Sequence, residues 1–160
     1  MQILIMRHGD AIPDAASDAA RPLSQAGRDE SRLMANWLND QHVDIERVLV
    51  SPYLRAQQTL DVVKEALPLP EEADCLSELT PGGDAQLVGY YLQTLAREGV
   101  GAVLVVSHLP LVGYLVAELC RNDTAPMFAT SAIACVQVDA STGHGTLNWQ
   151  VSPAQLTTKP

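Results

Sequence analysis

The chain has 160 residues, of which 47% are hydrophobic and 18% charged, with a formal net charge of −9 and a sequence pI of about 4.7. This length and composition predict one globular domain over residues 1–160, and they exclude a disordered chain. The acidic balance argues against a surface that binds nucleic acid or an anionic membrane.

The first half of the chain predicts two strand–helix units. The apolar run ILIM at 3–6 is typical of a strand buried on both faces, and a polar, turn-rich loop follows at 9–24. Ser24 is placed to cap the N-terminus of an amphipathic helix. The run RVLV at 47–50 predicts a second buried strand, which leads into a helix that ends at Pro68.

The next predicted elements continue this alternation. A short strand is expected at 73–76, and after the PGGD turn an amphipathic helix is expected at 87–95, with Leu87 on its apolar face. AVLVV at 102–106 is the clearest buried strand of the chain, and it leads into a helix that begins near Pro110.

The tail predicts an antiparallel hairpin from AIACVQV at 132–138 and GTLNWQV at 145–151, at one edge of the sheet. Together the elements predict an α/β fold with three layers, α/β/α, around a mainly parallel sheet with an antiparallel edge. In such sheets, ligand sites gather at the carboxyl ends of the strands, where loops lead to helix N-termini.

Two histidines and two arginines are expected to meet at that edge of the sheet. Arg7 and His8 end the first strand, Arg55 opens a helix, and His108 follows the strand at 102–106. Arginine suits bidentate recognition of phosphate oxygens, and helix N-termini favour anions. A neutral imidazole can attack phosphorus, while a second, protonated imidazole can stabilise the equatorial oxygens. Gly9 would let the backbone approach the ligand or turn away from it.

Three segments, in order along the chain, resemble the signatures of the histidine phosphatase superfamily, which has the phosphoglycerate-mutase-like fold. They are MRHGD at 6–10, SPYLRAQQT at 51–59 and VVSH at 105–108. The compact size, with RPLSQAG at 21–27 and SELTPGGD at 77–84, is similar to the protein-phosphohistidine phosphatases of this superfamily.

The resemblance implies that His8 is the nucleophile and becomes phosphohistidine. It implies that Arg7, Arg55 and His108 complete the phosphate pocket, with Arg21 as a further substrate contact. No cofactor is implied. The expected partner is a phosphohistidine-bearing phosphotransfer protein, because a chain without a lid domain leaves the pocket open to a phosphoryl group on another protein's surface. We expect the protein to act as a monomer.

A general acid is the open question of the predicted site. Glu78 is the best positional candidate, whereas Asp10 and Asp84 are weaker, and the other carboxylates are expected on a solvated surface. A general acid typically contributes about 10²–10⁴-fold when an alkoxide leaves. Imidazole has a pKa of about 6.5, so phosphohistidine can release a neutral imidazole with little help. A phosphohistidine phosphatase can therefore dispense with Glu78.

Two other functions stay open at this point. The first is a small-molecule phosphomonoesterase on the same fold, and the second is a non-catalytic module that binds phosphohistidine or another anion. A metal site is not expected, because His8 and His108 lack helical zinc spacing and two arginines would repel a cation.

The cysteines and the apolar runs indicate the compartment. Cys75, Cys120 and Cys135 are odd in number and widely spaced, which predicts reduced thiols, buried as small hydrophobic residues, in a cytoplasmic protein. The apolar runs are too short for a signal peptide or a membrane span, so no membrane association is expected.

Overall fold

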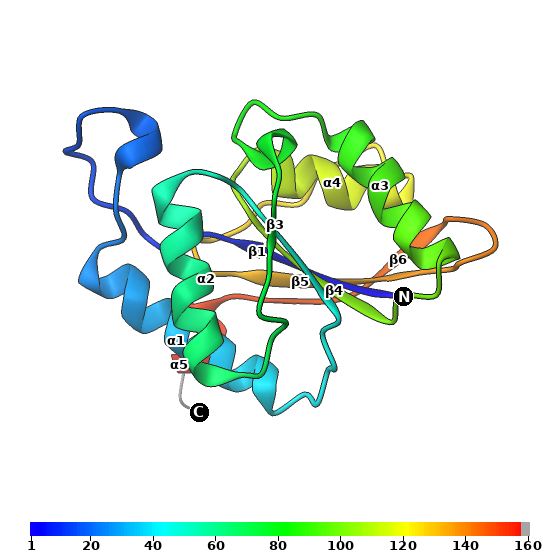
Figure 1. Ribbon diagram of the computed structural model, residues 1–160, viewed down its shortest axis with the longest axis horizontal. Helices are drawn as coiled ribbons and strands as arrows, with labels where there is room; N and C mark the ends of the chain where they lie inside the picture. The colour runs from blue at the N-terminus through cyan, green and yellow to red at the C-terminus, as the bar shows by residue number, and fades with distance from the viewer. Residues whose placement is uncertain (158–160) are drawn as a thin grey trace.

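The protein, described here over residues 1–157 by a computed structural model, has one central six-stranded sheet (Figure 1). The strands are β1 (Gln2–Arg7), β2 (Arg47–Val50), β3 (Asp74–Cys75), β4 (Ala102–Ser107), β5 (Ile133–Val138) and β6 (Gly145–Val151). Their order across the sheet is β3-β2-β4-β1-β5-β6. Strands β3, β2, β4 and β1 pair with their neighbours in parallel, whereas β5 is antiparallel both to β1 and to β6. The predicted parallel sheet with an antiparallel hairpin edge is confirmed.

Helices cover both faces of the sheet. They are α1 (Gln25–Asn39), α2 (Leu54–Ala66), α3 (Ala85–Arg97), α4 (Leu111–Cys120), α5 (Pro153–Thr157) and the 3₁₀ turns η1 (Asp18–Ala20) and η2 (Ser77–Leu79). In Figure 1, α1, α2 and α5 lie on one side of the sheet, and α3 and α4 lie on the other. The three-layer prediction is confirmed. Within residues 1–157, every helix is too short or too polar to cross a membrane.

The central strand β1 is held rigidly because both of its faces are buried. Ile3 and Ile5 pack with α3 and α4, whereas Leu4 and Met6 pack with α1 and α2, and all four side chains are fully buried. Burial of each such side chain contributes about 1.5–3 kcal/mol. The last residue of this strand, Arg7, and the residue after it therefore have a fixed position.

The helix ends follow local capping rules. Ser24 accepts a hydrogen bond from the backbone N–H of Gly27 at 3.0 Å, which confirms the predicted N-cap of α1. Helix α5 was not predicted, although its start carries a capping signal. The backbone N–H of Ser152 donates to the side chain of Gln155 at 2.7 Å, and Pro153 occupies the first helical position.

Two side chains expected in the core lie at the surface instead. Leu87 is 50% exposed, because it sits beside a groove at the edge of α3 while its neighbour Val88 faces the core. Cys75 is exposed, because β3 is a two-residue strand at the edge of the sheet. Cys120 and Cys135 are buried as predicted.

Candidate functional site

The structure brings Arg7, His8, Arg55 and His108 together at the carboxyl ends of the central strands. Strands β1 and β4 are adjacent, with Arg7 paired to Ser107, so the histidine after each strand lies beside the other. The two imidazole rings have centroids 4.9 Å apart, at 58° to one another. The Nε of Arg55 donates to Nε2 of His8 at 3.3 Å.

His8 is held as a neutral imidazole whose Nε2 lone pair accepts the hydrogen bond from Arg55. Its Nδ1 lies 2.6 Å from the carbonyl oxygen of Gly9, which only accepts, so Nδ1 carries the proton and Nε2 carries the lone pair. Burial, aided by the positive charges of Arg55 and Arg7 and opposed by the Gly9 hydrogen bond, lowers the pKa of His8 from 6.5 to about 4. The tautomer suits nucleophilic attack by Nε2.

His108 is also neutral, which corrects the expectation of a protonated second imidazole. Burial, together with His8 and Arg55, lowers the pKa of His108 to about 3. Its Nε2 lies 2.7 Å from the hydroxyl of Ser51, which already accepts from the backbone N–H of Tyr53. We assign the hydroxyl proton of Ser51 to this contact, so that the His108 proton lies on Nδ1; the opposite tautomer would make Nε2 the donor to Ser51.

Two buried polar atoms of this cluster have no hydrogen-bond partner in the described part of the chain. They are Nε of Arg7 and Nδ1 of His108. Nη1 of Arg7 donates to the carbonyl oxygen of Phe128 at 2.8 Å, whereas Nε of Arg7 has no acceptor among the described residues. An unpaired buried polar atom costs about 1–3 kcal/mol, so two of them in the cluster that holds His8 indicate a polar ligand, and the guanidinium groups of Arg7 and Arg55 favour an anionic one.

Asp18, which the sequence analysis assigned only to the solvated surface, belongs to this site. Its backbone oxygen accepts from Nη1 of Arg55 at 2.6 Å, and its Oδ2 accepts from Nη2 at 3.2 Å. Its Oδ1 accepts from Nη1 of Arg21 at 3.1 Å. These two guanidinium groups, Arg21 first, lower the pKa of the Asp18 carboxyl. The spacing of Asp18 and Arg21, three residues apart in SDAARP, is a signal that could have indicated the pair.

Arg21 lies at the outer side of the cluster. Besides Asp18, its guanidinium donates from Nε to the carbonyl of Ile12 at 3.2 Å, which ties both ends of the 9–24 loop together. Its charge is close enough to contribute to the lowered pKa of His8. The structure shows Arg21 near the nucleophile but bonded to the loop.

Gly9 is required for close packing against α1. A Cβ atom at Gly9 would lie 2.7 Å from the backbone oxygen of Gly27 in α1. The Gly9 N–H donates to the hydroxyl of Thr59 at 3.0 Å, and this hydroxyl donates to the carbonyl of Arg55 at 2.7 Å. Thr59, whose role the sequence analysis missed, joins the segment after β1 to the helix that carries Arg55.

None of the three candidate acids forms a hydrogen bond with the clustered residues in the described part of the chain, although the charge of Asp10 acts to raise the pKa of Arg7. Among residues 1–157, the carboxylate of Glu78 has one recorded hydrogen bond, at 3.4 Å to Ser77. Asp10 accepts from Ser24 at 2.8 Å, and Asp84 caps α3 by accepting from two backbone N–H groups. Within the described chain, no three histidine, cysteine or acidic side chains are grouped so as to hold a metal ion.

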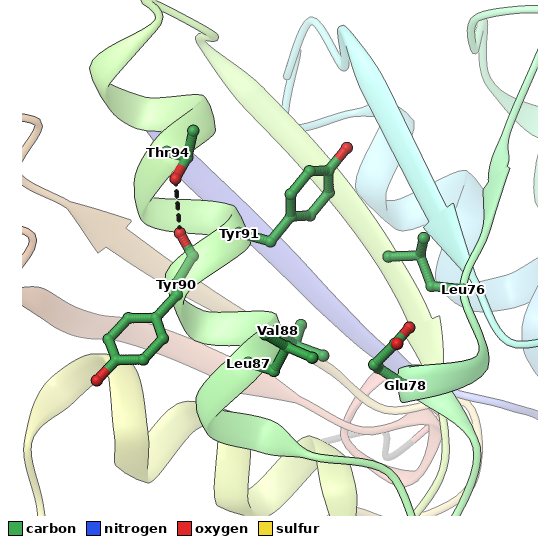
Figure 2. Close-up of a pocket in the computed structure, with 7 residues that line it drawn as sticks. All are labelled: Leu76, Glu78, Leu87, Val88, Tyr90, Tyr91 and Thr94. Carbon is green, nitrogen blue, oxygen red and sulfur yellow. Dashed lines mark hydrogen bonds between the residues drawn. The ribbon is translucent and has the colours of Figure 1, made fainter.

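Glu78 projects from η2 toward α3, into a largely apolar groove (Figure 2). The groove is lined by Leu76, Glu78, Leu87, Val88, Tyr90, Tyr91 and Thr94. None of the four clustered residues lines it. The turn itself is held to the end of β4, since the hydroxyl of Ser107 donates to the carbonyl of Leu79 at 2.6 Å. Ser107 therefore has a structural role, whereas Ser51 contacts Nε2 of His108.

We expect the free energy of unfolding to fall as the pH is lowered from 6.5 to about 4, because both buried histidines have depressed folded-state pKa values, of about 4 for His8 and about 3 for His108. Between pH 6.5 and about 4 the unfolded chain binds more protons at His8 and His108 than the folded chain does. The free energy of unfolding is therefore highest above pH 6.5 with respect to these two groups, and it falls on acidification. Urea unfolding at a series of pH values measures the loss.

The matched variants for this measurement are His108→Asn and His144→Asn. The first removes one buried histidine and is expected to flatten the dependence on pH, whereas the second changes an exposed residue outside the cluster and keeps the wild-type slope. Equal slopes in the wild type and His108→Asn would contradict the assignment.

Comparison with known proteins agrees with this geometry. Residues 3–88 match the family model described as histidine phosphatase superfamily (branch 1). The chain is 66% identical over 156 residues to the phosphohistidine phosphatase SixA of Escherichia coli, covering 98% of this chain and 96% of that protein. It is 42% identical over 161 residues to the SixA homolog of Haemophilus influenzae, covering 96% and 97% of the two chains.

Solved structures show the same fold. The structure of the protein histidine phosphatase SixA complexed with tungstate has a TM-score of 0.96 and 66% identity, covering 98% of this chain and all of that one. The alpha-ribazole phosphatase of Shigella flexneri, at 18% identity, has a TM-score of 0.75 over 96% of this chain and 97% of its own, and this likeness shows the fold alone.

Proposed function

The chain belongs to the histidine phosphatase superfamily (branch 1), and on this premise we propose that it is a metal-independent phosphohistidine phosphatase with a covalent intermediate on His8. The proposal takes residues 1–160 as one catalytic domain. It assigns nucleophilic attack to His8 and charge stabilisation to Arg7, Arg55 and His108. Arg21 is an outer substrate contact.

One observation carries the proposal. The cluster that holds the lone pair of His8 Nε2 also holds two buried nitrogen atoms without partners among residues 1–157, Nε of Arg7 and Nδ1 of His108. A tetrahedral phosphoryl group offers oxygen atoms to these atoms while it presents phosphorus to Nε2. The 66% identical SixA has been solved with tungstate, a tetrahedral oxyanion, and this supports the same use of the site here.

In the first step, Nε2 of His8 attacks phosphorus in line with the bond to the substrate histidine. The new bond is N–P between His8 and phosphorus, and the bond that breaks is N–P in the substrate, whose electron pair stays on the leaving ring. The other nitrogen of that ring carries a proton in the reacting phosphohistidine, so the ring leaves as neutral imidazole. Arg55 transfers its Nε hydrogen bond from His8 to a phosphoryl oxygen, while Arg7 and neutral His108 donate to the other oxygens. The carbonyl of Gly9 stabilises the positive charge that develops on the His8 ring.

In the second step, water attacks the phosphorus of phospho-His8. The N–P bond breaks, its electron pair returns to Nε2, and inorganic phosphate leaves with the oxygen of the water. The net reaction consumes one phosphohistidine and one water, and it yields histidine and phosphate. No external oxidant, reductant or metal enters this balance.

The substrate is proposed to be a phosphohistidine on a phosphotransfer protein, bound by the phosphatase as a monomer in cytoplasmic signal transduction. The names of the two similar proteins support phosphohistidine as the substrate group. His8 is 7% exposed, and the element order over residues 1–157 contains no inserted lid domain, so we expect the carrier of the phosphoryl group itself to cover the site. The free thiols of Cys75, Cys120 and Cys135 support a reducing compartment.

The test compares a histidine peptide phosphorylated with phosphoramidate against a panel of sugar phosphates. The proposal expects release of phosphate from the peptide and little from the panel. Turnover of sugar phosphates without turnover of the peptide would support a small-molecule phosphomonoesterase instead. Tight phosphate binding with no turnover of any substrate would indicate a binding module.

We expect Glu78→Gln to keep phosphohistidine turnover within about twofold of the wild type, because neutral imidazole leaves without the help of an acid. The same variant, assayed with p-nitrophenyl phosphate, controls for folding and binding. A loss of hundredfold or more on the phosphohistidine peptide would show that Glu78 does act as the general acid.

A further inference from the structure

The loop between β1 and α1 bonds Arg55 of the site through Asp18. Asp18 lies in the 3₁₀ turn η1, and its side chain is 58% exposed, whereas the Arg55 side chain that it bonds is 5% exposed. A mostly exposed ion pair usually contributes little, but here one partner is a buried guanidinium beside the nucleophile.

The contacts of Arg55 divide its guanidinium into two sides. The outer fork of Nη1 and Nη2 holds the backbone oxygen and Oδ2 of Asp18, at 2.6 and 3.2 Å. The Nε group faces His8, at 3.3 Å from Nε2. Arginine has five N–H donors in a rigid plane, so fixing the outer fork also fixes the direction of the Nε edge.

Asp18 is itself held in place by Arg21. Its Oδ1 accepts from Arg21, whose Nε is bonded to the carbonyl of Ile12 in the same loop. One carboxylate thus uses its two oxygens on two arginines. The Asp18 side chain is therefore fixed by hydrogen bonds to both of its carboxylate oxygens.

We infer that Asp18 is a positioning residue for the reaction proposed above, holding Arg55 by its outer fork so that the Nε edge stays directed at the phosphoryl group on His8. The inference rests on that proposed function. The alternative is that the Asp18 carboxylate competes with phosphate for Arg55. A competing carboxylate would bind the Nε group of Arg55, but this group faces His8.

The size of the effect follows from which contacts survive substitution. Asp18→Ala removes the Oδ2 acceptor of Arg55 Nη2 but keeps the backbone oxygen that accepts from Nη1. The Arg55 guanidinium thus loses one of its two hydrogen bonds to residue 18. We expect kcat on the phosphohistidine peptide to fall about tenfold, with a smaller change in KM, since the fixed donor matters most in the transition state. Asp18→Asn keeps an acceptor oxygen for Nη2 and is expected to recover most of the lost kcat.

The matched control is Asp14→Ala. It removes the same charge from an exposed position of the same loop, where no hydrogen bond or ion pair is recorded within residues 1–157. A second readout is independent of any substrate: the ¹⁵N–¹H signal of Arg55 Nε. We expect this signal to shift in Asp18→Ala and to stay in place in Asp14→Ala.

The inference is overturned if Asp18→Ala matches Asp14→Ala in kcat, or if it binds inorganic phosphate more tightly and turns over faster. Equal losses in Asp18→Ala and Asp18→Asn, or a loss of kcat with an unmoved Arg55 signal, would also overturn it. A wild-type protein without phosphohistidine turnover would instead refute the proposed function, and the Arg55 signal would still report whether Asp18 positions that group.

Discussion

Replacing His8 with alanine is expected to lower phosphohistidine turnover by at least about 10⁴-fold, the scale seen when a catalytic nucleophile is removed. His8 is a buried histidine whose Nε2 carries a lone pair, because its proton is fixed on Nδ1 by the carbonyl oxygen of Gly9. His108 cannot replace it, since its Nε2 is engaged by Ser51. The measurement is release of phosphate from the phosphorylated peptide.

The control for this variant is His144→Ala, which removes an exposed histidine and is expected to keep wild-type turnover. Circular dichroism of both variants establishes that they fold. A folded His8→Ala protein that kept a tenth of the activity would contradict the role assigned to His8.

Replacing Arg55 with alanine is expected to lower kcat by about 10²–10³-fold, the usual cost of removing one fixed donor from a developing anion. The variant removes the donor at 3.3 Å from His8 Nε2, and it also leaves Asp18 without its buried partner. Arg55→Lys keeps the charge but not the planar fork, so it is expected to recover only part of the activity.

Arg97→Ala is the matched control, because Arg97 is an exposed arginine of α3, away from the cluster. It is expected to leave kcat unchanged. Full activity of Arg55→Lys would contradict the claim that the direction of the guanidinium matters, and full activity of Arg55→Ala would remove Arg55 from the site.

The sequence was sufficient to predict which residues gather at the site. Alternating strands and helices imply a parallel sheet, and the carboxyl ends of adjacent parallel strands meet at one edge. Arg7, His8 and His108 follow apolar runs whose burial is dictated by their composition, so their placement follows from the fold. Arg55 follows from its place in the first turn of a helix.

The contacts that orient these residues were not predictable in the same way. Asp18 and Thr59 reach the site from a loop and from the second turn of α2, and neither position is implied by strand order. The charge of His108 was misjudged because it depends on burial and on neighbouring cations, which only the packed structure reveals. Cys75 and Leu87 were misplaced because hydropathy does not distinguish a sheet edge or a groove from the core.

The most direct test of the account is the chemical identity of the intermediate. Wild-type protein is mixed with the phosphorylated histidine peptide, quenched in alkali within milliseconds and digested, and the phosphorylated histidine is identified by ³¹P–¹⁵N NMR. The account predicts an acid-labile, alkali-stable phosphoryl group on Nε2 of His8, because Nδ1 is bonded to Gly9. A phosphoryl group on Nδ1, or turnover without any phosphorylated His8, would contradict it.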